Sequence, residues 1–341
     1  MLRKLIMLGL AGVLVFILLG GCVGKKEDEE EPIGMAVEFM DHAACAYIAQ
    51  HKGWFQEEGL KLSSYESYVT GMALASALAR GDIQVAYVCL VPAINAYANA
   101  GVPIKIVAGT HKHGYGLVVD PEKIEAVEDL EKPGMRIGCV REGGAVDIML
   151  RRFVEEYGLD EEAISGNIQR MNPPMQVIAV KTGRLDAAFI PEHHATVAEG
   201  YGFEMLVKSE DVWPEMQGSI LAVKESLIEE HPETVRKLVN VTQRATDWAK
   251  QNKDEAASIV AEELQATKGE IFPAKVSEAV AEESITSEIM YRSMWEGGRM
   301  SYTTAIDPDI VQNVIDYLAE LGYIKESFSA EEILDLRFME Q

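Results

Sequence analysis

Histidine has the most informative distribution of the chemically active residues in this chain. Five of the seven histidines fall where predicted strands end: His42, His111, His113, His193 and His194. The carboxyl ends of strands in an open α/β sheet form the crevice in which ligands bind. Neutral imidazole stacks on or hydrogen-bonds to a heterocycle, and it is also the commonest metal ligand. These histidines are therefore candidates for holding an organic ligand or a metal ion.

A metal site would need further ligands, and cysteine is the natural donor to consider. His111 and His113 are one residue apart, a spacing that allows chelation, with Cys45, Cys89 or Cys139 as further donors. The sequence holds no CxxC or HExxH motif. Because three cysteines cannot all pair with one another, we expect them to be small buried side chains. Contact with an organic ligand is the favoured interpretation, and we predict no bound metal.

Two predicted helix starts offer backbone donors to an anion. Thr70 stands directly before a predicted helix, as an N-cap residue does, and the N–H groups that follow it can bind a ligand. Gly143 and Gly144 precede another helix, and residues without a side chain let the backbone approach a ligand closely. For the neighbouring Arg141 the alternatives are an anion contact, a surface charge or an ion pair with Glu142.

A regular alternation of strands and helices positions these residues. The first series of predicted strands covers residues 33–39, 60–65, 84–90 and 104–108. The predicted helices between them cover residues 43–59, 71–80 and 92–99. Short strands alternating with helices of about ten residues predict a parallel sheet with crossover helices.

A second alternating series follows and suggests a second lobe. Its predicted strands cover residues 136–140, 167–171, 187–190 and 203–207, and its helices cover residues 145–157, 174–182 and 194–199. An apolar strand over residues 219–223 comes next, followed by predicted helices over residues 233–251, 255–264, 273–283 and 308–321. We expect this strand to return to the first sheet. Lobe 1 would then comprise residues 34–116 plus 219–341, and lobe 2 residues 117–218.

The N-terminus predicts export from the cytoplasm. Arg3 and Lys4 precede a short apolar run that ends in Leu-Gly-Gly-Cys at Cys22, as in a secretory signal peptide over residues 1–21. This ending resembles a prokaryotic lipobox, which implies cleavage before Cys22 and lipidation of its sulfur. The charged residues 22–32 then form a disordered tether. The alternative is an uncleaved membrane anchor; either way, we expect a chain held at the outer face of the cytoplasmic membrane.

Size and charge narrow the classes of function. The 341 residues are enough for two domains with sizeable cores. The formal net charge of -24 argues against nucleic acid or an acidic membrane surface as partner, because both require basic patches. A small-molecule partner suits this charge better.

Five stretches together form a family pattern. They are A-x-x-x-GWFQEEGL (residues 49–60), A-x-x-LARGDIQVAY (75–87), GVPIKIVAG (101–109), DL-x-x-PG-x-RIG (129–138) and VKTGRLDAA (180–188). The pattern resembles the solute-binding proteins of ABC importers in the nitrate/sulfonate/taurine group, which also contains thiamine-pyrimidine binders. The resemblance covers residues 33–223 and, more loosely, the helical tail.

The resemblance implies a fold, a function and a set of site residues. The fold would be α/β, of the two-lobed periplasmic-binding-protein type II, with a discontinuous first lobe and a C-terminal helical tail. Such a protein is not an enzyme, needs no cofactor, and delivers a small solute to an ABC permease and its ATPase. The candidate ligand contacts at strand ends and helix starts are Asp41, His42, Thr70, Gly71, Cys89, His111, His113, Arg141, Gly143, Gly144, Ala145, Glu192, His193 and His194.

Within this set we expect the two helix starts to face each other and to hold an anionic group. His42 and His193 would lie on opposite walls and contact the organic part of the solute. In the family, residues of Glu-Pro type often stand where this chain has its His193–His194 pair, so the solute class stays open: sulfonate, nitrate, bicarbonate or a pyrimidine-like heterocycle.

Three other functions are alternatives to solute import. Cleft histidines would suit a protein that binds a metal or a metal complex. A lipid anchor fits any surface protein, including a sensor domain. Yeast-type pyrimidine synthases share the fold, but their resemblance would bring a cysteine-rich motif, and this sequence has no cysteine-rich run. Solute import is the preferred hypothesis.

Overall fold

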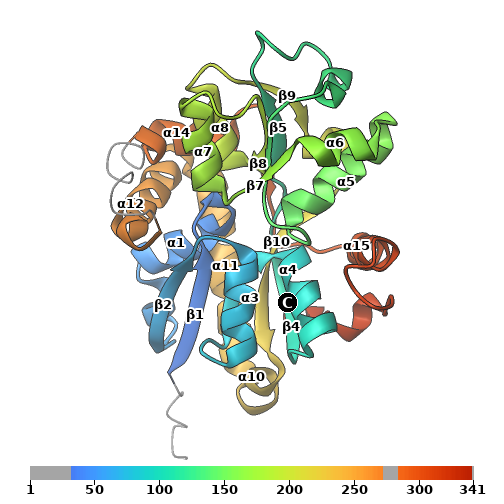
Figure 1. Ribbon diagram of the computed structural model, residues 1–341. Helices are drawn as coiled ribbons and strands as arrows, with labels where there is room; N and C mark the ends of the chain where they lie inside the picture. Colours follow the sequence, from blue (N-terminus) through green and yellow to red (C-terminus); the bar gives the residue numbers. More distant parts are fainter. Residues whose placement is uncertain (1–31, 272–282, 340–341) are drawn as a thin grey trace, which may run out of the picture. The chain divides into compact units, whose positions relative to one another are not determined.

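The computed structural model describes residues 32–271 and 283–339 (Figure 1). The predicted signal peptide, the lipidation of Cys22 and nearly all of the tether (22–32) lie outside the described residues. The predicted helix over residues 273–283 also falls almost wholly outside them. In the described part of the chain, no helix is long and apolar enough to cross a membrane.

Six of the described strands form a mixed sheet in the order β11-β4-β10-β3-β1-β2. They are β1 (Ile33–Glu38), β2 (Leu62–Tyr68), β3 (Val85–Cys89), β4 (Ile104–His113), β10 (Gln217–Lys224) and β11 (Met300–Tyr302). β1 runs parallel to β2 and β3, whereas β10 and β11 run antiparallel to their neighbours. The predicted parallel arrangement is correct for β1 to β3, whereas β10, for which we predicted no direction, enters from the second sheet antiparallel to β3 and β4.

The second sheet has five strands in the order β7-β6-β8-β5-β9. They are β5 (Tyr115–Val119), β6 (Ile137–Cys139), β7 (Ile168–Arg170), β8 (Ala187–Pro191) and β9 (Glu204–Lys208). β6 is parallel to β7 and β8, and β5 is antiparallel to β8 and β9. Both sheets belong to one compact unit, Glu31–Gln341.

The chain crosses between the sheets at two adjacent places. The first crossing is at Gly114, whose φ of 91° is a conformation that favours glycine. The second leads from α9 (Ser209–Val212) to β10, and the N–H of His113 donates to the Met216 carbonyl at 2.9 Å across the pair of crossings. The crossings lie close to the boundaries of the predicted division into residues 34–116 plus 219–341 and residues 117–218, but Tyr115 and Gly116 belong to the second sheet and Gln217 and Gly218 to the first. The division into two lobes stays a prediction.

Helices cover both faces of the first sheet, because successive strand residues point to opposite sides. Ala36, Ala86 and Val88 pack with α3 (Gly71–Arg80), α4 (Leu90–Ala100) and α15 (Pro308–Glu320) in one core cluster. Met35, Val37 and Tyr87 pack on the other face. The helices there are α1 (Ala44–His51), α11 (Pro232–Gln251) and α12 (Lys253–Ile271). Two short helices, α2 (Trp54–Glu57) and α10 (Glu225–Glu230), complete this part (Figure 1).

The second sheet is also sandwiched between helices. Leu117 and Phe189 pack against α5 (Ala145–Tyr157), whereas Val118 and Ile190 pack against α7 (Pro173–Lys181) and α8 (Glu192–Glu199). The remaining helix of this part is α6 (Glu161–Asn167). From the helical C-terminal region, α14 (Ser287–Trp295) packs on α8. The α/β class, the two sheets and the helical tail are all as predicted.

Three element boundaries differ from the prediction in ways that matter for the site. Gly53, with φ of 71°, splits the predicted first helix into α1 and α2. β4 continues past the predicted end at residue 108 to His113, because β10 and β11 both pair with its last residues. α8 begins at Glu192, two residues before the predicted start, so Glu192, His193 and His194 form its first turn.

Candidate functional site

A cavity of about 230 Å³ lies where strand ends of both sheets meet the starts of α3, α4 and α5. Apolar side chains form most of its wall: Met40, Val69, Met72, Pro92, Val140 and Val146. Its polar lining residues are Glu38, Thr70, Ser76, Cys89, Tyr115 and Arg141. A mainly apolar cavity with a few polar groups is the usual form of a small-molecule site.

Glu38, the last residue of β1, supplies a buried carboxyl group to this cavity. Its side chain is 1% exposed, and Oε2 accepts hydrogen bonds from the Cys89 N–H at 3.1 Å and the Cys89 thiol at 2.9 Å. Burial raises the pKa of Glu38 to about 7, and the two bonds from Cys89 lower it only in part. The carboxyl group therefore gains or loses its proton near neutral pH.

Gly71 is required by the position of Glu38. A Cβ atom at Gly71 would lie 2.1 Å from Glu38 Oε1 and 2.8 Å from Pro92 Cγ. The carboxyl group thus fits against the first turn of α3 only because residue 71 has no side chain. Thr70 is the N-cap of this helix, as predicted, since its Oγ1 accepts from the Ala73 N–H at 3.3 Å.

Cys89 joins three strands at the inner end of the cavity. It ends β3, the Tyr115 hydroxyl of β5 donates to its Sγ at 3.0 Å, and the Ser219 hydroxyl of β10 does so at 3.5 Å. Burial, together with the charge of Glu38, raises the pKa of the Cys89 thiol well above its usual value. In the absence of a cation, the thiol keeps its proton.

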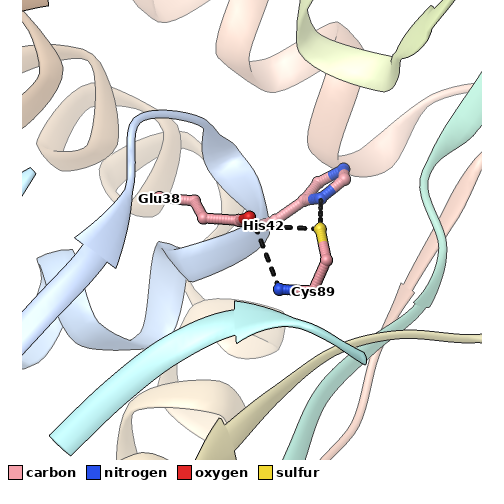
Figure 2. A group of neighbouring side chains, drawn as sticks. All are labelled: Glu38, His42 and Cys89. Carbon is pink, nitrogen blue, oxygen red and sulfur yellow. Dashed lines mark hydrogen bonds between the residues drawn. The ribbon is translucent and has the colours of Figure 1, made fainter. Parts of the chain in front are cut away.

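His42 lies beside this thiol in a short 3-10 turn, Asp41–Ala43. It is fully buried, its Nε2 is 2.9 Å from the Gly114 carbonyl, and its Nδ1 is 3.9 Å from Cys89 Sγ (Figure 2). Burial lowers the pKa of His42 to about 3, so the ring is neutral at neutral pH. Because a carbonyl can only accept, we assign the single ring proton to Nε2, which leaves Nδ1 as a bare lone pair.

Six of the predicted contact residues line the cavity: Thr70, Gly71, Cys89, Arg141, Gly144 and Ala145. Gly144 is the N-cap of α5 in an extended conformation, with φ of -80° and ψ of 162°. The structure therefore brings the starts of α3 and α5 to one cavity, as we expected. That these residues touch a solute stays a prediction.

The glycine pair itself offers little to an anion. The Gly143 N–H donates to Asp147 Oδ2 at 3.1 Å, and the Gly144 N–H donates to the Arg141 carbonyl at 3.1 Å. Gly143 does not line this cavity, and its carbonyl accepts from Asn95. The backbone donors left at the start of α5 are the next N–H groups of the first turn, which have no acceptor within the helix.

The histidines of β4 are packed inside the protein and do not line the cavity. His111 is fully buried, and its ring centroid lies 4.2 Å from that of His42. A Cβ atom at Gly218 would lie 2.1 Å from the His111 ring, which shows how tightly this ring is enclosed. His113 is 6% exposed and ends the strand at a φ of 63°, unusual for a residue other than glycine.

The remaining predicted contacts lie under the helical tail, outside the cavity wall. Glu192 forms an ion pair with Arg299 at 2.9 Å, His193 Nε2 lies 3.2 Å from the Ser284 carbonyl, and Asp41 accepts from the Ser293 hydroxyl. His194 is 3% exposed and packs against His193. The expected arrangement, with His42 and His193 on opposite cavity walls, is not found, because α14 covers α8.

Sequence reasoning missed the two most buried polar groups of the cavity, Glu38 and Tyr115. Glu38 could have been recognised from the sequence, because it is the one charged residue among the apolar residues of β1. A charge in a strand buried on both faces needs an explanation by function or pairing. Tyr115 lies between two glycines at the first crossing, and nothing in its local sequence indicates which way its hydroxyl points.

Comparison with known proteins places the chain among binding proteins. It matches the NMT1-like family over residues 26–265, more than half of its length. The putative aliphatic sulfonates-binding protein of Bacillus subtilis (strain 168) is 26% identical over 316 residues, covering 89% of this chain and 92% of that protein. The taurine-binding periplasmic protein of Escherichia coli (strain K12) is 24% identical over 215 residues, covering 61% and 64%.

Solved structures agree with the two-sheet architecture. The alkanesulfonate-binding protein SsuA from Xanthomonas axonopodis pv. citri, bound to MOPS, matches with a TM-score of 0.72 at 14% identity, covering 90% of this chain and 99% of that one. The nitrate-binding protein NrtA from Synechocystis PCC 6803 matches with a TM-score of 0.71 at 14% identity, covering 90% and 86%. The predicted periplasmic-binding-protein fold is confirmed, and the chain belongs to the NMT1-like family.

Proposed function

We propose that this chain is the extracytoplasmic solute-binding lipoprotein of an ABC importer. It would be anchored through a lipid on Cys22 and would deliver a small solute to a permease and its ATPase. The observation that carries the proposal is the cavity, whose wall comes from both sheets. A movement of one lobe about the two adjacent crossings would open or close such a cavity.

Two ends of the cavity differ in charge and favour one orientation of the solute. The start of α5 combines unpaired backbone donors with the guanidinium of Arg141, which attracts an anionic or hydrogen-bond-accepting head group. The start of α3 lies against the Glu38 carboxyl group, which repels an anion when it is ionised. We therefore orient the head group toward α5 and the rest of the solute toward Met72 and Pro92.

The apolar wall supports an organic solute over an inorganic oxyanion. Nitrate or bicarbonate would leave Met40, Val69 and Val146 without an apolar partner, whereas an alkyl or ring group covers them. Relatives named for aliphatic sulfonates and taurine point the same way. The solute class we favour is a small organic molecule with one anionic or polar head, such as a sulfonate.

We infer that the cavity binds its solute and does not convert it chemically. The relatives and the matching structures are named as binding proteins, which supports a chain that captures its solute and does not convert it. The Nε2–H of His42 and the thiol of Cys89 both donate hydrogen bonds within the protein, to the Gly114 carbonyl and to the Glu38 carboxyl group.

A thermal-shift screen followed by calorimetry tests the proposal. The full-length protein is mixed with alkanesulfonates, taurine, nitrate, bicarbonate and pyrimidine-type heterocycles. A true solute present at 100 times its Kd adds about 2.7 kcal/mol to the free energy of unfolding. We expect hits among the organic anions, returned chemically unchanged. Chemical conversion of a hit would contradict the transport function, as would a screen in which all of these compounds leave the melting temperature unaltered.

A further inference from the structure

Three side chains with metal-binding atoms converge at the inner end of the cavity (Figure 2). They come from separate segments: Glu38 from the end of β1, His42 from the following 3-10 turn and Cys89 from the end of β3. A carboxylate oxygen, an imidazole nitrogen and the sulfur all lie within 4.8 Å of one another, and all three residues are buried. Glu38 and Cys89 also line the cavity, so one side of the cluster faces the space that a solute would fill.

The orientation of His42 is that of a metal ligand. Its Nε2–H donates to the Gly114 carbonyl at 2.9 Å, which fixes the ring and leaves the Nδ1 lone pair directed toward Cys89 Sγ at 3.9 Å. Histidines that bind metals usually donate their other ring N–H to a carbonyl or a carboxylate, and this second contact fixes the tautomer.

The spacing of the donor atoms suits a tetrahedral ion. Bond lengths of roughly 2.0–2.3 Å to nitrogen, oxygen and sulfur separate neighbouring ligand atoms by about 3.3–3.7 Å. The two measured separations fall on either side of this range: 2.9 Å between Sγ and Glu38 Oε2, and 3.9 Å between Sγ and His42 Nδ1. The third pair, the Glu38 oxygen and the His42 nitrogen, lies within 4.8 Å. Side-chain movements of up to about 1 Å would bring all three donors to a common centre.

Charge balance also favours a cation here. Within the described residues Glu38 has no ion-pair partner, and the hydrogen bonds to its carboxyl group come from Cys89 alone. An unpaired carboxyl group buried among apolar residues is costly. One divalent cation with a carboxylate, a thiolate and a neutral imidazole gives a site of zero net charge. The hydroxyl groups of Tyr115 and Ser219, which already donate to the sulfur, would stabilise the thiolate.

We propose that Glu38, His42 and Cys89 form a three-ligand site for a borderline divalent ion such as Zn²⁺, with the fourth position open to the cavity. A thiolate, an imidazole and a carboxylate together select an ion of this class over Mg²⁺ or Ca²⁺. On binding, the ion loses water molecules and gains bonds to sulfur, nitrogen and oxygen. The S–H bond of Cys89 breaks, and its proton passes to solvent.

This site goes beyond the proposed transport function and does not depend on it. The ion would bind whether or not the chain delivers a solute to a permease. If the chain also binds a solute in this cavity, the open fourth position would give that solute a direct contact with the metal. The ion would then counter the repulsion that an ionised Glu38 exerts on an anionic solute.

Cobalt substitution tests the site in the full-length protein. The protein is stripped with a chelator and titrated with Co²⁺ while its absorption spectrum is recorded. We expect one equivalent to produce a thiolate-to-cobalt charge-transfer band with visible bands of tetrahedral intensity, and Zn²⁺ to abolish both. Cys89→Ser should remove the charge-transfer band and weaken Zn²⁺ at least about 100-fold in competition with a chromophoric chelator. Glu38→Gln, close in shape, should weaken it at least about 10-fold.

Two control variants test whether the metal binds at this site and not at another thiol or imidazole of the chain. Cys139→Ser alters another buried thiol, and His51→Ala removes an imidazole paired with Glu263 at the surface; both should keep the band and the affinity. Absence of the band in the wild-type protein overturns the proposal, as does a band of equal strength in Cys89→Ser. Should Cys89→Ser fail to fold, the wild-type spectrum and the Zn²⁺ affinity of Glu38→Gln decide: a normal affinity in that variant contradicts the site.

Discussion

Two buried glutamates, Glu38 and Glu192, have the same side chain and opposite surroundings. Glu192 is held under the tail by Arg299 at 2.9 Å and by the Thr196 hydroxyl at 3.0 Å. Glu38 has hydrogen bonds from Cys89, no ion-pair partner among the described residues, and one side on a cavity. Burial raises the pKa of both carboxyl groups, and at Glu192 the positive charge of Arg299 opposes the rise.

The difference separates a structural charge from a candidate site. The ion pair of Glu192 continues through Arg299 to Glu199 at 2.6 Å and on to Arg292, so its charge is balanced within the protein, although Oε2 of Glu192 has no hydrogen-bond partner among the described residues. The carboxyl group of Glu38, in contrast, lines a cavity that no other part of the described chain fills. Buried titratable residues are therefore informative about function when they lack a partner and reach a cavity.

The largest effect on stability is expected from removing the ion-pair partner of Glu192. Arg299→Ala leaves Glu192 buried without its counter-charge, and we expect the free energy of unfolding to fall by roughly 3–5 kcal/mol. Urea denaturation measures this loss. The double variant Glu192→Gln with Arg299→Met should recover part of it, because neither residue then carries a charge. A loss below about 1 kcal/mol in Arg299→Ala would show that the pair contributes no more than a surface ion pair does.

The unpaired carboxyl group of Glu38 should make the free energy of unfolding depend on pH. In metal-free protein Glu38 keeps its proton up to about pH 7, whereas in the unfolded chain it keeps it only to about 4.5. Its contribution therefore favours the folded state below pH 4.5 and is lost as the pH rises to 7, by about 3 kcal/mol in total. Glu38→Gln should reduce the slope by this amount, while the part due to Asp41 and Glu192, whose pKa values burial also raises, remains. Chemical denaturation in chelator at several pH values compares the two proteins.

An unchanged slope in Glu38→Gln would mean that other groups titrate in this window, and the description of Glu38 as an unpaired carboxyl group would be wrong. Asp41 is the group to examine next, since burial raises its pKa to about 7 as well. Asp41→Asn, in which the Ser293 contact can persist, is therefore measured in parallel.

A smaller effect is expected at the opposite end of the cavity. Arg141 is exposed, so its charge is screened by solvent, and Arg141→Gln should weaken an anionic solute by about 1 kcal/mol, or about five- to tenfold in Kd. An uncharged analogue should bind both proteins alike. Arg184→Gln, an exposed position outside the cavity wall, is the matched control for calorimetry. Equal loss for charged and uncharged solutes would contradict the head-group orientation.

Most of the fold could be predicted because its signals are local. Periodic apolar residues, Thr70 as the N-cap and Gly81 after the last turn place α3 at residues 71–80, as predicted. The direction of β10 could not be predicted from its own residues, because a strand with this sequence could join a sheet in either direction. Its place between β3 and β4 depends on the chain returning from the second sheet.

The site was harder to predict, because its geometry depends on residues far apart in the chain. The last five residues of β4 are held by partners more than a hundred positions away, so the strand continues to His113, and His111, expected at a strand end, lies within it. The tail helix α14 covers His193 in the same way. Glu38 was the one residue that could have been found, from a single charge in an apolar strand.

The most direct test of the central claim, that the cavity between the sheets is the solute site, fills that cavity. Ala73 lines it from α3, whereas Ala79 on the same helix is exposed and lies outside its wall. Calorimetry is performed on Ala73→Trp and Ala79→Trp with the tightest-binding compound of the solute screen. We predict that Ala73→Trp weakens binding more than about 100-fold, or 2.7 kcal/mol, and that Ala79→Trp binds as the wild type does. Wild-type affinity in a folded Ala73→Trp would place the solute elsewhere and contradict the account.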